Sequence, residues 1–137
     1  MTRLLYILAS LILLLPGDGV CQDKKLIRSI YFLGGSYYID HHQEQELINF
    51  LDSIPNIEQY NITIHSHTDN IGGALFNKRL SEMRSWSAEQ ILTPGYVKKE
   101  AVEIQDFGQF NPLYDNSTHE GRMKNRRVDI IFWPISI

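Results

Sequence analysis

Residues 26–133 alternate between short β-rich stretches and longer segments whose apolar residues recur at helical spacing. Along the chain the order is strand, helix, strand, helix, strand, polar loop and strand. Strands that alternate with helices build a sheet covered by helices, so this order predicts an α/β fold of the α+β sandwich type. The whole chain has 137 residues, which is enough for one domain with a single hydrophobic core.

The strands are predicted by short runs of β-branched and aromatic residues with alternating polarity. Residues 26–32 read LIRSIYF and end at a Gly-Gly pair, residues 61–65 read NITIH, and residues 101–107 form a third run. The last run, RVDIIFW at residues 127–133, alternates regularly. The side chains expected to face the core from these strands are Ile62, Ile64, Val128, Ile130 and Phe132.

The two helices are bounded by recognisable start and stop residues. Asp40 is the expected N-cap of the first helix, with Gln43 as its capping-box partner, and Pro55 ends that helix. The second helix is predicted over residues 74–92, before Pro94 and Gly95. The side chains expected to face the sheet are Leu47, Ile48, Leu51, Ile54, Leu80, Met83, Ser87, Ala88 and Ile91.

The first 21 residues have the composition of an export signal. Arg3 precedes an apolar stretch, Leu4 to Leu15, which is too short to span a bilayer comfortably. Cleavage after Cys21 leaves small residues at the positions that signal peptidases read. We therefore expect a signal peptide at residues 1–21 and one domain at residues 22–137, exported to the periplasm or the periplasmic face of an outer membrane. An uncleaved N-terminal anchor is the alternative.

Cys21 is the only cysteine in the chain, so no disulfide can form within it. A cysteine after an apolar run is also typical of bacterial lipoproteins, which are acylated on that residue. The preceding residues, Asp18, Gly19 and Val20, match the usual lipoprotein pattern poorly. Ordinary cleavage is the favoured expectation, and lipidation of Cys21 is the alternative.

The charge of the chain argues against one class of partner. The formal net charge is −3, and it stays −3 without residues 1–21, which hold one basic and one acidic residue. Nucleic-acid-binding domains usually carry a net positive charge. The basic run around Arg122 and Arg127 therefore does not predict nucleic-acid binding.

The stretch IHSHTDNIGG at residues 64–73 resembles the opening ligands of metal-dependent hydrolases. His65 and His67 alternate on an extended segment, so their side chains point the same way and can share a metal. Such hydrolases need further ligands downstream, and the only later histidine is His119, in a polar loop. We therefore expect no metal, and we interpret the histidines as the end of a strand.

A longer pattern around this stretch is more specific. HTDNIGGALFNKRLSEMRSW is followed by GQFNPLYDNSTHEGRMKNRRVDI, and together they resemble the OmpA-like C-terminal domain family, the peptidoglycan-associating module of several envelope proteins. The resemblance covers about residues 26–133. The matching residues are Thr68, Asp69, Gly72, Asn77, Leu80, Ser81, Arg84, Gly108, Pro112, Gly121, Arg122, Asn125, Arg126, Arg127 and Val128.

The resemblance implies a mixed four-stranded sheet with helices on one face, and non-catalytic binding of peptidoglycan without a cofactor, in a Gram-negative-type envelope. The implied ligand is the diaminopimelate of the stem peptide, whose free end carries an ammonium and a carboxylate. Asp69 is expected to bind the ammonium and Arg84 the carboxylate, with two parallel hydrogen bonds. The expected supporting residues are Thr68, Gly72, Asn77, Arg122, Asn125 and Arg127.

Each assignment has a simpler alternative. Asp69 can be the N-cap of the second helix, and Arg84 can be a solvated helix residue. Arg126 and Arg127 alternate on a strand, so one faces the ligand while the other is solvated or pairs with an acid such as Asp129; the sequence favours Arg127 as the binding residue only weakly. The whole domain can also be a scaffold that binds another envelope protein, and a metal-dependent hydrolase is a distant third function.

Overall fold

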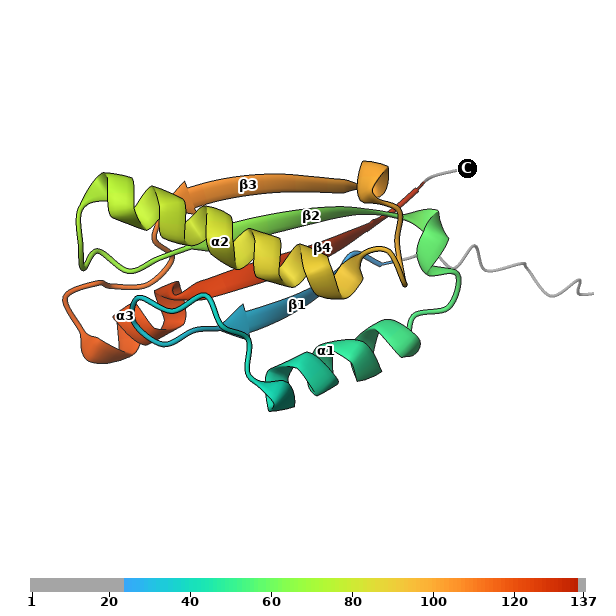
Figure 1. Cartoon of the computed structure of the whole chain (residues 1–137), viewed down its shortest axis with the longest axis horizontal. Helices are drawn as coiled ribbons and strands as arrows, with labels where there is room; N and C mark the ends of the chain where they lie inside the picture. The colour runs from blue at the N-terminus through green and yellow to red at the C-terminus, as the bar shows by residue number, and fades with distance from the viewer. Residues whose placement is uncertain (1–23, 136–137) are drawn as a thin grey trace, which may run out of the picture.

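The computed structural model describes residues 24–135 (Figure 1). The expected signal peptide, its cleavage site and Cys21 lie outside the described residues. The described elements are β1 (Leu26–Tyr31), α1 (His41–Asp52), η1 (Ile57–Gln59), β2 (Tyr60–His67), α2 (Ala74–Leu92), η2 (Lys99–Ala101), β3 (Val102–Gly108), α3 (His119–Asn125) and β4 (Arg127–Pro134). Within residues 24–135, no helix has the length and apolar character that crossing a membrane requires.

The four strands form one mixed sheet in the order β1-β4-β2-β3. β4 pairs antiparallel with both β1 and β2, while β2 and β3 are parallel because α2 connects them as a crossover. α1 and α2 both cover the same face of the sheet (Figure 1). The predicted α/β class, the mixed sheet and the placement of the helices are confirmed.

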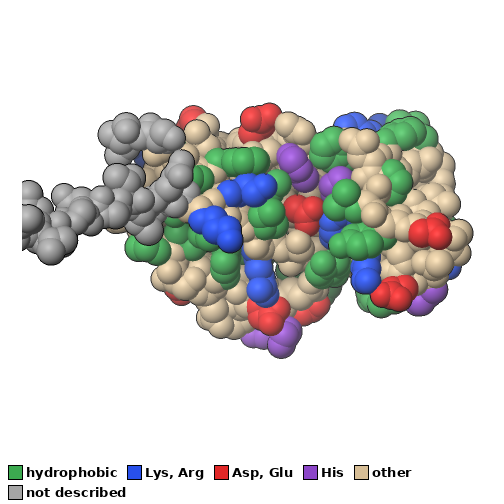
Figure 2. Space-filling view, turned by 180° about the vertical axis from the view of Figure 1, so that it is seen from behind, with side chains coloured by type: hydrophobic (Ala, Val, Ile, Leu, Met, Phe, Trp, Pro, Cys, Tyr) green, Lys and Arg blue, Asp and Glu red, His purple; other side chains and the backbone are tan. Residues whose placement is uncertain are grey.

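The core lies between this face and the two helices. Ile62, Ile64, Val128, Ile130 and Phe132 are at most 1% exposed, as the strand alternation predicts. Their alternate neighbours on β2 and β4 point to the opposite face, which none of the helices within residues 24–135 covers. Figure 2 shows that face with histidine, acidic and basic side chains gathered among apolar ones.

The inward face of α2 differs from the prediction. Met83 is 41% exposed, whereas Asn77, Ser81, Arg84 and Ser85 are at most 1% exposed. Hydrophobic periodicity missed this face because it is polar, and these side chains are retained there by hydrogen bonds rather than by apolar burial.

The segment before β4, expected to be a loop, contains the short helix α3. Thr118 caps it: its Oγ1 accepts from the N–H of Gly121 at 2.9 Å. A Cβ on Gly121 would lie 1.8 Å from the carbonyl oxygen of Asp115, so this close approach requires glycine. The seven residues carry no apolar stripe, which is why their sequence suggested a loop.

The first helix begins as predicted, with one difference at its cap. Asp40 accepts from the Gln43 N–H at 3.0 Å. Gln43 does not complete the box on the Asp40 backbone; its side chain bonds the Asp40 carboxylate and both backbone groups of Tyr31. Gln43 therefore also connects α1 to the end of β1.

Candidate functional site

A pocket of about 230 Å³ lies where the end of β2 leads into α2. Its walls come from the loop before α1, the β2–α2 loop, the N-terminal half of α2 and the residue before β4. The polar and glycine residues that line it are Gly34, Gly35, Thr68, Asp69, Gly72, Asn77, Arg84 and Arg126. Of the eight residues expected to bind the ligand, the pocket contains Thr68, Asp69, Gly72, Asn77 and Arg84.

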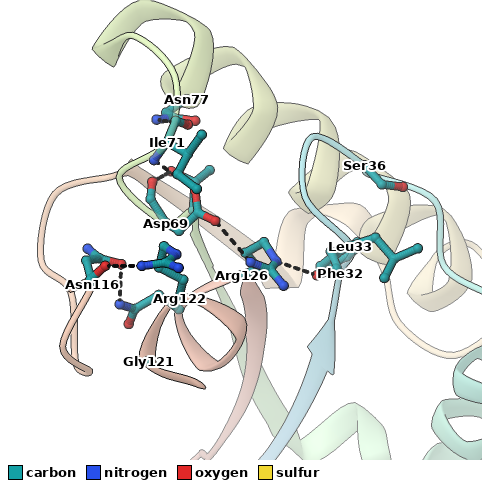
Figure 3. Close-up of polar contacts among 12 residues, drawn as sticks. Phe32, Leu33, Ser36, Asp69, Ile71, Asn77, Asn116, Gly121, Arg122 and Arg126 are labelled. Carbon is teal, nitrogen blue, oxygen red and sulfur yellow. Dashed lines mark hydrogen bonds and ion pairs between the residues drawn. The ribbon is translucent and has the colours of Figure 1, made fainter. Parts of the chain in front are cut away.

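Asp69 is held at the centre of this pocket and is only 6% exposed. Its Oδ1 accepts from the Ile71 N–H at 3.0 Å, and its Oδ2 receives Nη1 of Arg126 at 3.1 Å (Figure 3). The N-cap of α2 is Gly73, which makes no side-chain cap. The alternative in which Asp69 caps α2 is therefore excluded.

Arg84 is fully buried and reaches from α2 into the two neighbouring loops. Its guanidinium donates to the carbonyl oxygens of Ser36 at 2.8 Å, His67 at 2.9 Å and Leu33 at 3.1 Å. Its central carbon lies 4.8 Å from the centre of the Phe32 ring. The alternative in which Arg84 is a solvated helix residue is wrong, because Arg84 joins α2 to the ends of β1 and β2.

The charge of Arg84 survives this burial. Loss of water lowers the pKa of Arg84 to about 10, an effect that Asp69 opposes and Arg126 reinforces. The pKa remains far above neutral pH, so the guanidinium is charged. Its hydrogen bonds to backbone use three of the five N–H groups that a guanidinium carries.

Arg126 is the second cation of the pocket, and the sequence assignment missed it. Its Nε donates to the Phe32 carbonyl oxygen at 3.0 Å while its Nη1 binds Asp69, so it links the segment after β1 to the β2–α2 loop (Figure 3). The Arg126 and Asp69 side chains are 12% and 9% exposed. Among the described residues, Nη2 of Arg126 makes no hydrogen bond to another side chain or to backbone.

The expectation that Arg127 is the arginine of this pair that faces the pocket is wrong. Arg127 is the first residue of β4, and its Nε pairs with Asp129, two residues on, at 2.9 Å. Residues two apart on a strand share a face, so both point away from the helices. The spacing did indicate that one arginine pairs with Asp129, but it did not show which.

Asn77 and Thr68 shape the floor of the pocket. Asn77 donates through Nδ2 to the Ile71 carbonyl oxygen at 3.1 Å and to the Gln109 side chain at 2.8 Å. Its buried Oδ1 has no partner among the described residues. Thr68 donates from its hydroxyl to the Asp69 carbonyl oxygen at 2.9 Å. Asn77 and Asp69 therefore both line the pocket, and the buried Asn77 oxygen is an acceptor without a partner among the described residues.

Arg122 and Asn125 lie outside the pocket. Arg122 donates to the Asn116 carbonyl oxygen at 2.9 Å (Figure 3). Asn125 is fully buried, and its amide bonds both backbone groups of Tyr114, at 3.1 and 2.8 Å, as well as the Asn116 side chain. Both residues therefore stabilise the loop before α3, and neither lines the pocket.

The two histidines occupy the open face of the sheet, beside Arg127 and Asp129. The His67 ring stacks on Phe107, with centroids 4.9 Å apart. Burial, reinforced by Arg127, lowers the pKa of His67 to about 4, so its imidazole is neutral at pH 7. Among residues 24–135, no three His, Cys, Asp or Glu side chains are grouped as metal ligands.

Comparisons with known proteins agree on one family. The model of the OmpA family matches residues 31–126. The peptidoglycan-binding protein ArfA of Mycobacterium tuberculosis is 33% identical over 124 residues, which are 85% of this chain and 37% of ArfA. The outer-membrane lipoprotein YfiB of Pseudomonas aeruginosa is 36% identical over 70 residues, 51% of this chain and 42% of YfiB. The match to outer membrane porin F covers about a quarter of that protein.

Solved structures have the same fold. The peptidoglycan-associated lipoprotein from Burkholderia pseudomallei superposes with a TM-score of 0.64 at 26% identity, over 77% of this chain and 89% of that one. The OmpA-like domain of FopA1 from Francisella tularensis gives a TM-score of 0.67 at 15% identity, over 82% of this chain and 75% of that one. The family model spans most of the described residues, and residues of its motif lie around the pocket at the end of β2. The chain therefore belongs to the OmpA family.

Proposed function

We propose that this domain binds peptidoglycan without catalysis, through the diaminopimelate of the stem peptide. The observation that carries the proposal is the juxtaposition of one carboxylate, Asp69, with two guanidinium groups, Arg84 and Arg126, in a single small pocket. A ligand end with both an ammonium and a carboxylate complements this arrangement. The names of ArfA and the peptidoglycan-associated lipoprotein, which state that these proteins bind or associate with peptidoglycan, support the same ligand class.

Each end of the ligand has a proposed partner. The ammonium is received by the Asp69 carboxylate and by the unpaired Oδ1 of Asn77. The carboxylate is received by Nη2 of Arg126 and by the N–H groups of Arg84 that backbone carbonyls leave free. Gly35 and Gly72 leave room for the ligand, because both border the pocket without a side chain.

The charged groups of the pocket fit binding rather than proton transfer. Arg84 stays charged at neutral pH, and Asp69 is held by the Ile71 N–H and by Arg126. Groups of both signs that hydrogen bonds hold in place can orient a zwitterion. We accordingly propose a non-enzymatic module of the cell envelope, in the periplasm or on the periplasmic face of an outer membrane. The match to an outer-membrane lipoprotein supports that location.

Co-sedimentation with purified sacculi tests the proposal. Asp69→Asn removes the anion but keeps the shape of the side chain, so we expect the variant to remain in the supernatant while the wild type sediments. Glu82→Gln is the matched control, because Glu82 is an exposed acid on α2. Equal sedimentation of Asp69→Asn and wild type contradicts the proposed contact. Thermal melting of each variant confirms that it is folded.

A protein-binding scaffold is the second candidate function. A separate apolar groove of about 470 Å³ borders the same loop and shares Arg126 with the pocket; Tyr31, Leu33, Tyr38 and Met123 also line it. Grooves with apolar walls are typical of protein interfaces. If the folded wild-type chain does not sediment with sacculi, the scaffold is favoured over the peptidoglycan module.

A further inference from the structure

A second hollow, of about 360 Å³, lies on the other side of the loop that walls the candidate pocket. It is formed where the beginning of α1 faces the C-terminal half of α2. We call this concavity the aromatic hollow. Its aromatic and polar lining residues are Tyr37, Tyr38, Glu44, Trp86, Ser87 and Gln90. Tyr38 also lines the apolar groove, and the other residues of the hollow have no part in the proposed function.

The aromatic hollow and the pocket follow one stripe of α2. Leu80 and Arg84 line the pocket, and Ser87 and Ile91 line the hollow. With a rise of 1.5 Å per residue, the step from Leu80 to Ser87 or Ile91 is about 10–16 Å. The loop between them is pinned to α2, because the Ser36 carbonyl oxygen accepts from Nε of Arg84 at 2.8 Å. The two sites are therefore neighbours along α2, on either side of a single fixed loop.

Three large aromatic side chains border the hollow and are well exposed. Tyr38 is 73% exposed, Trp86 57% and Tyr37 41%. One exposed aromatic residue is ordinary, but three around one concavity form a patch of the kind that binds a partner. Tyrosine and tryptophan combine an apolar ring with a polar edge, and they are favoured where a ligand is partly apolar and partly hydrated.

The side chains around the hollow complement the chemistry of a pyranose sugar. A sugar ring has apolar C–H faces and a rim of hydroxyl or acetamido groups, so it needs aromatic faces together with polar edges. Trp86 and the tyrosines supply the faces. Glu44, Ser87 and Gln90 supply hydrogen-bond donors and acceptors beside them.

We propose that the aromatic hollow binds an N-acetylated sugar of the glycan strand while the pocket holds the stem peptide attached to it. This inference rests on the proposed function, because the peptide brings the sugar to the hollow. A few extended residues, at about 3.5 Å each, cover the distance between the two sites. The hollow thereby adds a glycan contact to a peptide site.

Calorimetry with two probes tests the inference on the purified chain. One probe is a synthetic stem peptide that contains diaminopimelate, and the other is the disaccharide muropeptide with the same peptide. We expect the wild type to bind the muropeptide about 3- to 10-fold more tightly than the free peptide, the range expected for one aromatic contact. Trp86→Ala should remove this difference and leave the affinity for the free peptide unchanged.

The control is Met83→Ala, on the same helix and 41% exposed but outside the hollow, which should behave like the wild type. Tyr38→Ala gives a second measurement on the opposite wall, and it should reduce the preference for the muropeptide as Trp86→Ala does. Equal binding of both probes by the wild type, or unchanged muropeptide affinity in Trp86→Ala, overturns the glycan contact alone. Failure of the folded wild type to bind either probe overturns the proposed function as well.

Discussion

Two arginine–aspartate pairs start from adjacent residues of this chain and lie on opposite sides of the sheet. Arg126 reaches Asp69, 57 positions away in the sequence, at 3.1 Å. Arg127 reaches Asp129 on its own strand at 2.9 Å, and Ser29 of β1 donates to the same aspartate at 2.6 Å. The first pair joins two loops, whereas the second lies within regular sheet.

The difference separates a ligand site from a structural contact. Arg126 and Asp69 border the pocket and keep hydrogen-bonding capacity that a ligand can use. Arg127 is only 3% exposed, and it lies on the open face of the sheet, 5.9 Å from the centre of the Tyr114 ring. A charged pair in a loop can be rearranged by a ligand, while a pair within a sheet is held by the strand register. We therefore expect the two pairs to respond differently to substitution.

The largest effect is expected at Arg84, which supports the pocket from below. Arg84→Ala leaves three backbone carbonyl groups without their donor, so we expect a loss of about 3–5 kcal/mol in the free energy of unfolding. Urea unfolding followed by circular dichroism measures it. Arg79→Ala is the control, since Arg79 is exposed on the same helix. A loss below about 1 kcal/mol contradicts the supporting role of Arg84.

Replacing one member of each pair in turn tests the comparison directly. Arg127→Ala leaves Asp129 partly buried without its cation, so we expect about 3 kcal/mol of destabilisation with sacculus binding retained. Asp69→Asn should lose sacculus binding and change stability by about 1 kcal/mol or less, because the amide still accepts from Ile71. If Arg127→Ala abolishes binding while it remains folded, the assignment of the two arginines is reversed.

The open face of the sheet should also be more sensitive to acid than the candidate pocket. The folded-state pKa of His67 is about 4, below its ordinary value near 6.5, so below about pH 6.5 the unfolded chain binds a proton that the folded chain does not. Stability should fall from about pH 6.5 to 4 by about 2–3 kcal/mol on account of His67. Unfolding measured across this range should show a smaller decrease for His67→Gln. Parallel profiles for the two proteins rule out this linkage.

Apart from Asp69→Asn, whose main effect is on binding, the smallest effect on stability is expected at Gly72, where the pocket loop turns with a φ of 98°. A Cβ there would lie 3.0 Å from Cδ1 of Phe76, whose ring is more than half exposed and can move. The strained backbone alone should make Gly72→Ala about 1–2 kcal/mol less stable. Gly73→Ala, with open space around its Cβ, is the control in the same melting experiment. Equal stability of the two variants contradicts the argument.

Much of the fold was predictable because its signals are local. Alternation on β4 predicts the burial of Val128, Ile130 and Phe132, and Asp40 and Gln43 mark the start of α1. The short helix α3 was missed because it has no apolar periodicity. Met83 was misplaced on α2 for a related reason: the side chains that turn inward there, such as Arg84, are polar.

The site was only partly predictable. The motif placed Thr68, Asp69 and Gly72 in one loop and Asn77 and Arg84 on the helix that follows, and all five border one pocket. The sequence of two consecutive arginines does not show which side chain faces the pocket and which lies on the open face of the sheet. That depends on where β4 begins after α3, and so on contacts between segments distant in the sequence.

The sequence by itself determined the order of the four strands and the two long helices, the strand side of the core and the family motif, because hydrophobic periodicity and spacing are properties of neighbouring residues. Only the tertiary structure decided that Arg126 faces Asp69, that Arg84 is buried beneath them, and that Arg127 belongs to the open face. The physical reason is that the partner of a buried charge is set by which loops meet around it. Here those segments follow β1 and β2 and precede β4, three strands that are neighbours in the sheet.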